Sequence, residues 1–145
     1  MDLLGVIKRS VDTKFDISET YSNLIGKSHA RFRDECILAQ QNGVSLTILI
    51  ESAPYVKSLD DVKSWIHWGQ MRAYCKRNGL PMGTGMFDAI DEYVSHGGQK
   101  PPVSGAQLHK AMCTMAENYG FNWEFCSKDD AGVRIIDILT RDNAR

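Results

Sequence analysis

The strongest core strand of this chain is predicted at VSLTILIE, residues 44–51. The run is almost continuously apolar, is rich in β-branched side chains and ends in an acid, Glu51. Near-continuous hydrophobicity is typical of a strand that is covered on both faces, as in the sheets of α/β proteins. We therefore expect this strand at the centre of a sheet.

Two helices are expected immediately before that strand. Asp16 suits the start of a helix at Ile17–Leu24, because its carboxylate can accept hydrogen bonds from free backbone N–H groups. Gly26 interrupts the helical pattern, a second helix is predicted at 28–41, and Gly43 is its stop signal.

After the central strand the pattern loosens over residues 53–103, which are predicted to form a variable insert. A short amphipathic segment at 59–68 and a short helix at 86–94 are expected within it, and glycine- and proline-rich loops flank the helix. The capping-box pattern SGAQ at 104–107 predicts a helix that ends at Gly120. The last two predicted elements are a strand at 121–126 and an amphipathic helix at Ala131–Leu139.

This order of elements predicts a single α/β domain over residues 1–145. Two short strands within residues 3–14, with a bend at Gly5, precede the two helices and the central strand, and a helix, a strand and a helix follow the insert. We expect a mixed central sheet flanked by helices. A chain of 145 residues can bury one substantial core but not two.

The composition is that of a soluble globular protein, with 43% hydrophobic and 24% charged residues. No apolar run approaches the ~20 residues that cross a bilayer, and the N-terminus lacks the features of a secretory signal. We therefore expect no membrane partner and a cytoplasmic location. The four histidines are too dispersed to indicate a metal centre. The cysteines lack any C-x-x-C pair and are expected to be buried apolar residues in a reducing compartment: Cys36, Cys75, Cys113 and Cys126.

The net charge of −1 does not supply the basic field that a general DNA-binding protein usually carries. Basic residues nevertheless gather locally, and each cluster is either a binding patch or an ordinary solvated face. The clusters are Lys8 with Arg9, Lys27 with Arg31 and Arg33, and Arg72 with Lys76 and Arg77.

A short motif in the second predicted strand carries possible chemistry. Asp12 and Lys14 are two residues apart, so on an extended segment their side chains point to the same face. A second carboxylate from a neighbouring strand would complete an oxygen-ligand site suited to Mg²⁺, and a lysine beside it can hold a water or an attacked phosphate. Taken alone, the triplet is a weak signal, because most such triplets are ordinary solvated surface.

Residues 11–51 resemble the nuclease domain of XPF-type structure-specific endonucleases, in the small form that many phages and prophages carry. This family belongs to the restriction-endonuclease-like PD-(D/E)xK superfamily. Asp12 and Lys14 match the acid and lysine of its second strand, Asp2 matches the aspartate of its Gly-Asp strand, and Glu51 matches the glutamate that ends its Ile-Glu strand. Residues 101–139 are similar to the C-terminal helix–strand–helix of the same phage proteins.

The chain departs from the family pattern in three places. Met1 stands where the family has the glycine of Gly-Asp, and the strand and helix that normally precede it are missing. Ser18 replaces a further aspartate, although Asp16 and Glu19 flank it. The resemblance therefore implies an incomplete sheet edge, which a longer reading frame, a partner chain or a second copy in a homodimer could complete.

The resemblance also implies roles for individual residues. Asp2 and Asp12 are expected to bind Mg²⁺ or Mn²⁺, helped by the carbonyl of Thr13, while Lys14 orients the attacking water and stabilises charge on the phosphate. Glu51 is either a further metal or water ligand or a strand-end residue exposed to solvent.

DNA contacts are predicted from the basic residues near this motif. Arg31 and Arg33 match the basic helix of the family and are expected to contact phosphates, with pairing to Asp34 or Glu35 as the alternative. Lys8 and Arg9 are predicted to bind DNA as well. The insert also contains three aromatic residues near Arg72 and Lys76, namely Trp65, Trp68 and Tyr74. They either stack on exposed bases or anchor the insert on the core, and we favour anchoring.

Together these features predict a Mg²⁺-dependent endodeoxyribonuclease that acts on branched or structured DNA in a bacterial or phage-infected cell. The alternative is a catalytically impaired nuclease-fold protein that binds DNA or a protein partner. A resolvase of four-way junctions from the same superfamily is a third possibility.

Overall fold

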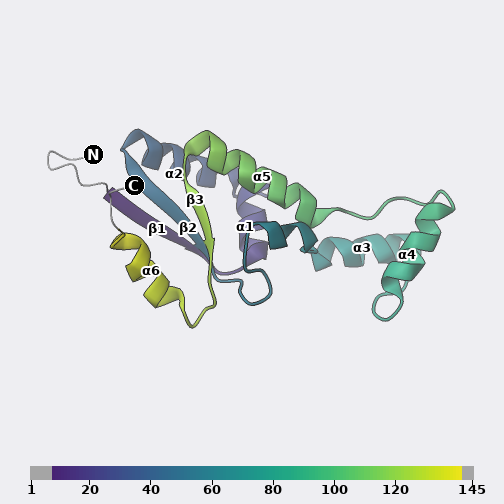
Figure 1. Ribbon diagram of the computed structural model, residues 1–145. Helices are drawn as coiled ribbons and strands as arrows, with labels where there is room; N and C mark the ends of the chain where they lie inside the picture. Colours follow the sequence, from purple (N-terminus) through teal and green to yellow (C-terminus); the bar gives the residue numbers. More distant parts are fainter. Residues whose placement is uncertain (1–7, 142–145) are drawn as a thin grey trace.

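The computed structural model describes residues 8–141, and over this range the chain is an α/β protein with a three-stranded parallel sheet and six α-helices (Figure 1). Figure 1 shows α1, α2 and α5 on one face of the sheet and α6 on the other. The elements are β1 (Lys8–Lys14), α1 (Ile17–Leu24), α2 (His29–Gln41), β2 (Val44–Ile50), the 3₁₀ helix η1 (Asp60–Ser64), α3 (Trp68–Asn78), α4 (Met86–Ser95), α5 (Ser104–Tyr119), β3 (Asn122–Phe125) and α6 (Ala131–Leu139).

The predicted core strand is confirmed as the centre of the sheet. The strand order is β1-β2-β3, and every residue of β2 from Leu46 to Ile50 is buried. β1 pairs with β2 in parallel, with Lys14 opposite Ile50 and Asp12 opposite Ile48.

The expectation of a mixed sheet is wrong for the part of the chain that the structure describes, because all of its strands run parallel. The cause is the connections: α1 and α2 carry the chain from β1 back to the start of β2, and α5 does the same before β3. Only the later of the two strands expected within residues 3–14 falls largely in the described range, where it is β1.

The two faces of β2 belong to two separate cores. Ile48 and Ile50 point to the larger core, which also contains Phe32 of α2 and Leu108 and Met112 of α5. The opposite face is covered by a smaller core of Leu49, Cys126 and Ile138, and the last of these comes from α6. Because strand side chains alternate with period 2, the even-numbered residues of β1 and β2 share the α1–α2 face.

The start of α1 follows the prediction. The Asp16 carboxylate accepts the backbone N–H of Glu19 at 2.9 Å, and the Glu19 carboxylate accepts the backbone N–H of Phe15 at 2.6 Å. This reciprocal pair satisfies two N–H groups that the helix itself cannot.

The prediction that residues 104–107 form a capping box is wrong, because α5 has no side-chain cap at its start. Ser104 is the first residue of α5 rather than its cap, and its buried hydroxyl has no hydrogen-bond partner within residues 8–141. The reason is close packing against η1. A Cβ atom on Gly105 would lie 2.5 Å from the carbonyl oxygens of Val62 and Lys63, so the tight contact of this turn, and not a cap, determines where α5 begins.

The insert contains more helix than predicted. Of the amphipathic segment expected at 59–68, only η1 is helical, while α3 was not predicted at all. Helices α3 and α4 form an arm that extends away from the sheet beyond η1 (Figure 1). The arm has a small core of its own, made of Met71, Tyr74, Cys75, Met86 and Ile90.

Across the described range, no helix combines the length and the apolar character needed to cross a membrane. All four cysteine thiols are free, and three of them are buried.

Candidate active site

Asp12 and Lys14 lie together on the α1–α2 face of β1. The Lys14 ammonium is 3.0 Å from Oδ2 of Asp12, which confirms that the two side chains point to the same face. Lys14 is 5% exposed, whereas the side chain of Asp12 keeps 36% of its surface accessible. The pair thus consists of a buried cation and a carboxylate that solvent can reach.

Two further groups hold the Lys14 ammonium. It donates a hydrogen bond of 3.1 Å to Oδ1 of Asn23, and it lies 4.9 Å from the centre of the Phe32 ring. The Asn23 amide is itself fixed, because its Nδ2 donates to the carbonyl of Glu19 at 2.6 Å. A buried charge is costly unless it is paired and hydrogen-bonded, and here a carboxylate, an amide oxygen and a ring face share that task.

The Asp12 carboxylate borders a hollow of about 400 Å³ between β1, β2 and α2. Glu35 of α2 lines the same hollow, so a second carboxylate lies on the wall that Asp12 faces. Burial, together with the charges of Glu35 and Asp12, raises the pKa of the nearby Cys36 thiol to about 11. The thiol therefore stays protonated at neutral pH and is a poor nucleophile and metal ligand.

Glu51 is joined to β1 through its backbone, because its N–H donates to the carbonyl of Lys14 at 2.9 Å. It follows the last residue of β2 and borders a larger hollow of about 610 Å³ at the carboxyl ends of the strands, together with Asp16 and Asp129. Burial and, after it, the charge of Glu51 raise the pKa of Cys126, which belongs to the α6-side core. The Glu51 side chain makes no hydrogen bond or ion pair with Asp12 or Lys14 within residues 8–141.

The predicted DNA-binding residues separate into two groups. Arg31 and Arg33 are exposed on α2, and neither forms an ion pair with Asp34 or Glu35 in the described part of the chain. Lys8 and Arg9 begin β1, about 20 Å along the strand from Lys14 at ~3.3 Å per residue. Asp2, the other predicted metal ligand, lies outside the described residues.

The residues present fit a hard divalent cation in part. Only Oδ2 of Asp12 contacts Lys14, and no hydrogen bond to Oδ1 comes from residues 8–141, so one carboxylate oxygen remains for a cation. Mg²⁺ commonly keeps several waters and takes only one or two carboxylates from the protein. No group of three or more histidine, cysteine, aspartate or glutamate residues within 8–141 is arranged to hold a metal ion.

Sequence reasoning missed Asn23 and Glu35 as site residues. Asn23 is nine positions from Lys14 and reaches it only because α1 folds back over β1. Glu35 was considered solely as a partner for a neighbouring arginine. The weak signal for it was its place between Phe32 and Cys36, the two buried residues of α2.

No protein-family model, no curated protein and no solved structure matches this chain.

Proposed function

We propose that this protein is a metal-dependent endonuclease that hydrolyses phosphodiester bonds in branched or structured DNA. We further propose that it belongs with the XPF-type nucleases and adopts their restriction-endonuclease-like fold. The observation that carries the proposal is the 3.0 Å contact between the buried Lys14 ammonium and the accessible Asp12 carboxylate. An aspartate and a lysine in this relation are the residues that the family motif requires at these positions.

The division of roles follows from burial and contacts. Asp12, with the carbonyl of Thr13, would hold Mg²⁺ or Mn²⁺ through its free oxygen. Such an ion supplies Lewis-acid activation of the phosphate and of the attacking water. Lys14 would place its charge beside the phosphate, and Asn23 and Phe32 keep the ammonium from turning away. A preorganised cation of this kind stabilises charge that develops in the transition state.

A second carboxylate is needed for a complete site of this class. Asp2 remains the residue that the motif indicates, and Glu35 is the acid that shares the hollow with Asp12. A second chain or a second copy of this one could also add a strand beside β1, and the mass of the protein in solution would test this.

The Glu51 carboxylate has no contact with Asp12 or Lys14 among the described residues, which favours a second candidate function, a nuclease-fold protein that binds DNA or a protein without cutting. One experiment decides between the two. Purified protein is incubated with labelled flap, three-way and four-way junction DNA, with Mg²⁺ or with Mn²⁺. We expect cleavage by the wild type and its loss in Asp12→Ala and Lys14→Ala.

The chain offers a matched control for these variants. Lys63 and Asp60 form an ion pair with the same 3.0 Å separation, but on an exposed turn. Asp60→Ala and Lys63→Ala should therefore cleave as the wild type does. DNA binding without cleavage under either ion would overturn the enzyme proposal, as would full activity in Asp12→Ala. Cleavage confined to four-way junctions by a dimer would identify a resolvase.

A further inference from the structure

The three aromatic residues of the insert have different environments. Tyr74 is 1% exposed and its hydroxyl donates to the carbonyl of Gln99 at 2.5 Å, while Trp65 packs on Tyr21 with 5.6 Å between ring centres. These two anchor the arm, as expected. Trp68 is 48% exposed, so the anchoring role predicted for it does not account for its position.

Trp68 begins a row of side chains along the exposed face of α3. Arg72 and Lys76 follow at intervals of four residues, so all three lie on one side of the helix, whereas Arg77 is turned about 100° around the helix from Lys76. All three cations are exposed, and none of them forms an ion pair with an acidic side chain between residues 8 and 141. The row therefore presents one large aromatic ring and two positive charges without an acidic partner, and Arg77 adds a third cation on a neighbouring part of the helix surface.

The other helix of the arm has the opposite charge. Asp88, Asp91 and Glu92 are exposed on α4, and α3 and α4 pack through the apolar core between them. The acidic residues consequently do not neutralise the cations of α3. A polyanion is attracted to the α3 side of the arm and repelled from the α4 side.

The base of the arm is tied to the helix that supports the candidate active site. Gln70 of α3 donates to the hydroxyl of Tyr21 at 2.8 Å, and the His67 ring meets the Tyr21 ring edge-on at 5.0 Å. Tyr21 belongs to α1, and the same helix supplies Asn23 to Lys14. The start of α3 is therefore held in a fixed relation to the helix that contacts Lys14.

We propose that the exposed face of α3 formed by Trp68, Arg72 and Lys76 binds a single-stranded segment of DNA. The cations neutralise its phosphates and Trp68 stacks on an unpaired base, which is how proteins bind single strands without reading their sequence. The inference rests on the proposed function, because it names the unpaired part of a branched substrate as what the arm binds.

The test uses a fluorescein-labelled oligo(dT) strand, with anisotropy titrations at several KCl concentrations in EDTA, so that no cleavage takes place. In Arg72→Gln/Lys76→Gln we expect at least tenfold weaker binding. The slope of log K against log[salt] should fall by about 1.4, since each phosphate contact on a single strand contributes ~0.7. Lys57→Gln/Lys110→Gln removes the same charge from exposed lysines outside α3 and should keep the wild-type slope.

The aromatic contribution is measured separately. Trp68→Ala should weaken binding about 5- to 100-fold, the range for loss of one base–aromatic stack, with an unchanged salt slope. Unchanged affinity and slope in Arg72→Gln/Lys76→Gln would overturn the inference. Tighter binding of duplex DNA of equal length, with the same dependence on these residues, would overturn its assignment to single strands.

These outcomes are distinguishable from failure of the nuclease proposal. Binding through α3 with no cleavage of any substrate keeps this inference and overturns the enzyme. Cleavage that depends on Asp12, together with wild-type DNA binding in the α3 variants, keeps the nuclease proposal and overturns the inference about α3.

Discussion

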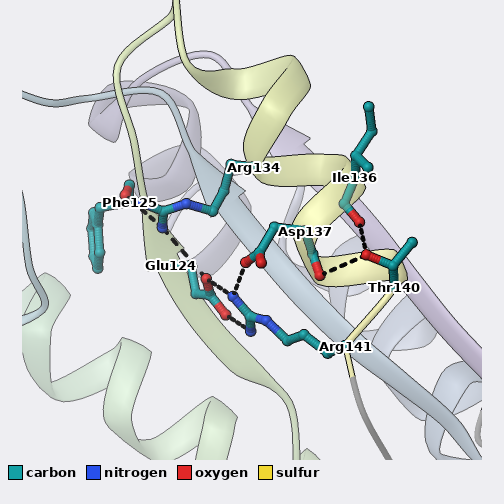
Figure 2. Close-up of polar contacts among 7 residues, drawn as sticks. All are labelled: Glu124, Phe125, Arg134, Ile136, Asp137, Thr140 and Arg141. Carbon is teal, nitrogen blue, oxygen red and sulfur yellow. Dashed lines mark hydrogen bonds and ion pairs between the residues drawn. The ribbon is translucent and has the colours of Figure 1, made fainter.

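The two faces of the sheet each carry a group of partly buried charges, but the groups differ in how completely they are satisfied. On the α6 face, Glu124 of β3 accepts hydrogen bonds from Arg141 on both carboxylate oxygens and one from Arg134 at 3.5 Å (Figure 2). Arg141 also donates to Asp137 at 3.0 Å. On the α1–α2 face, Asp12 uses one oxygen for Lys14 and keeps the other.

This difference separates a structural clamp from a carboxylate that keeps an oxygen available to a ligand. The Arg141 hydrogen bond is the main reason that the pKa of Glu124 is lowered, and it fastens the end of α6 to β3. Both oxygens of Glu124 accept hydrogen bonds from arginine side chains. A buried lysine beside an accessible, half-used carboxylate is the opposite arrangement. The presence of ion pairs alone would not have distinguished the two faces.

The largest expected effect is on catalysis. Lys14→Met should lower the single-turnover cleavage rate about 100-fold or more, the usual cost of removing one preorganised charge or donor. Glu124→Gln, on the other face, should cleave within about twofold of the wild type at a temperature where both are folded. Equal losses in the two variants would show that the faces do not differ in function.

For stability, in contrast to catalysis, we expect a substitution at Glu124 on the α6 face to have a large effect. Glu124→Ala should lower the free energy of unfolding by about 2 kcal/mol, because it leaves the guanidinium groups without their charged acceptor. Urea denaturation followed by circular dichroism measures this. Asp60→Ala, at the exposed ion pair, serves as the control and should unfold at the wild-type urea concentration. A midpoint for Glu124→Ala that equals the wild-type midpoint would contradict the clamp.

Asn23 is expected to act through Lys14, as a positioning residue. Asn23→Ala should lower kcat about tenfold with little change in KM, because the ammonium loses its orienting acceptor while substrate contacts remain. Asn23→Asp restores an acceptor and should recover much of kcat. A purely structural role would instead reduce the folded fraction of both variants and leave kcat per folded molecule unchanged.

The smallest effect concerns pH. The folded-state pKa of Glu124 lies below its usual value of 4.5, so its contribution to stability is present above pH 4.5 and is lost as the pH falls through the folded-state value. Thermal unfolding between pH 6 and pH 3 should show a shallower loss of stability in Glu124→Gln than in the wild type. Parallel curves for the two proteins would show that the clamp does not titrate.

The sequence was sufficient wherever a local rule decided the outcome. The apolar run of β2 predicted its central place, period 2 predicted that Asp12 and Lys14 share a face, and Asp16 predicted the start of α1. It failed where packing between distant segments decided. α3 buries only Met71, Tyr74 and Cys75, too few apolar positions to give a helical pattern. The contact of Gly105 with η1 likewise has no local signature.

The candidate site shows the same division. Its motif residues could be read from the chain, whereas the support from Asn23 depends on how α1 crosses β1. That the Glu51 side chain borders the hollow at the carboxyl ends of the strands was not predicted from its place at the end of a strand. The side of the sheet on which a strand-end residue lies depends on the turn that follows it.

The central claim is that Asp12 and Lys14 form one catalytic centre, and a double-mutant cycle tests it most directly. Single-turnover cleavage of a flap substrate with Mg²⁺ is measured for the wild type, Asp12→Asn, Lys14→Met and the double variant. Residues that act as a unit give non-additive losses, so the double variant should be no slower than the slower single variant. Losses that multiply, or a wild type that cleaves no faster than the double variant, would contradict the account.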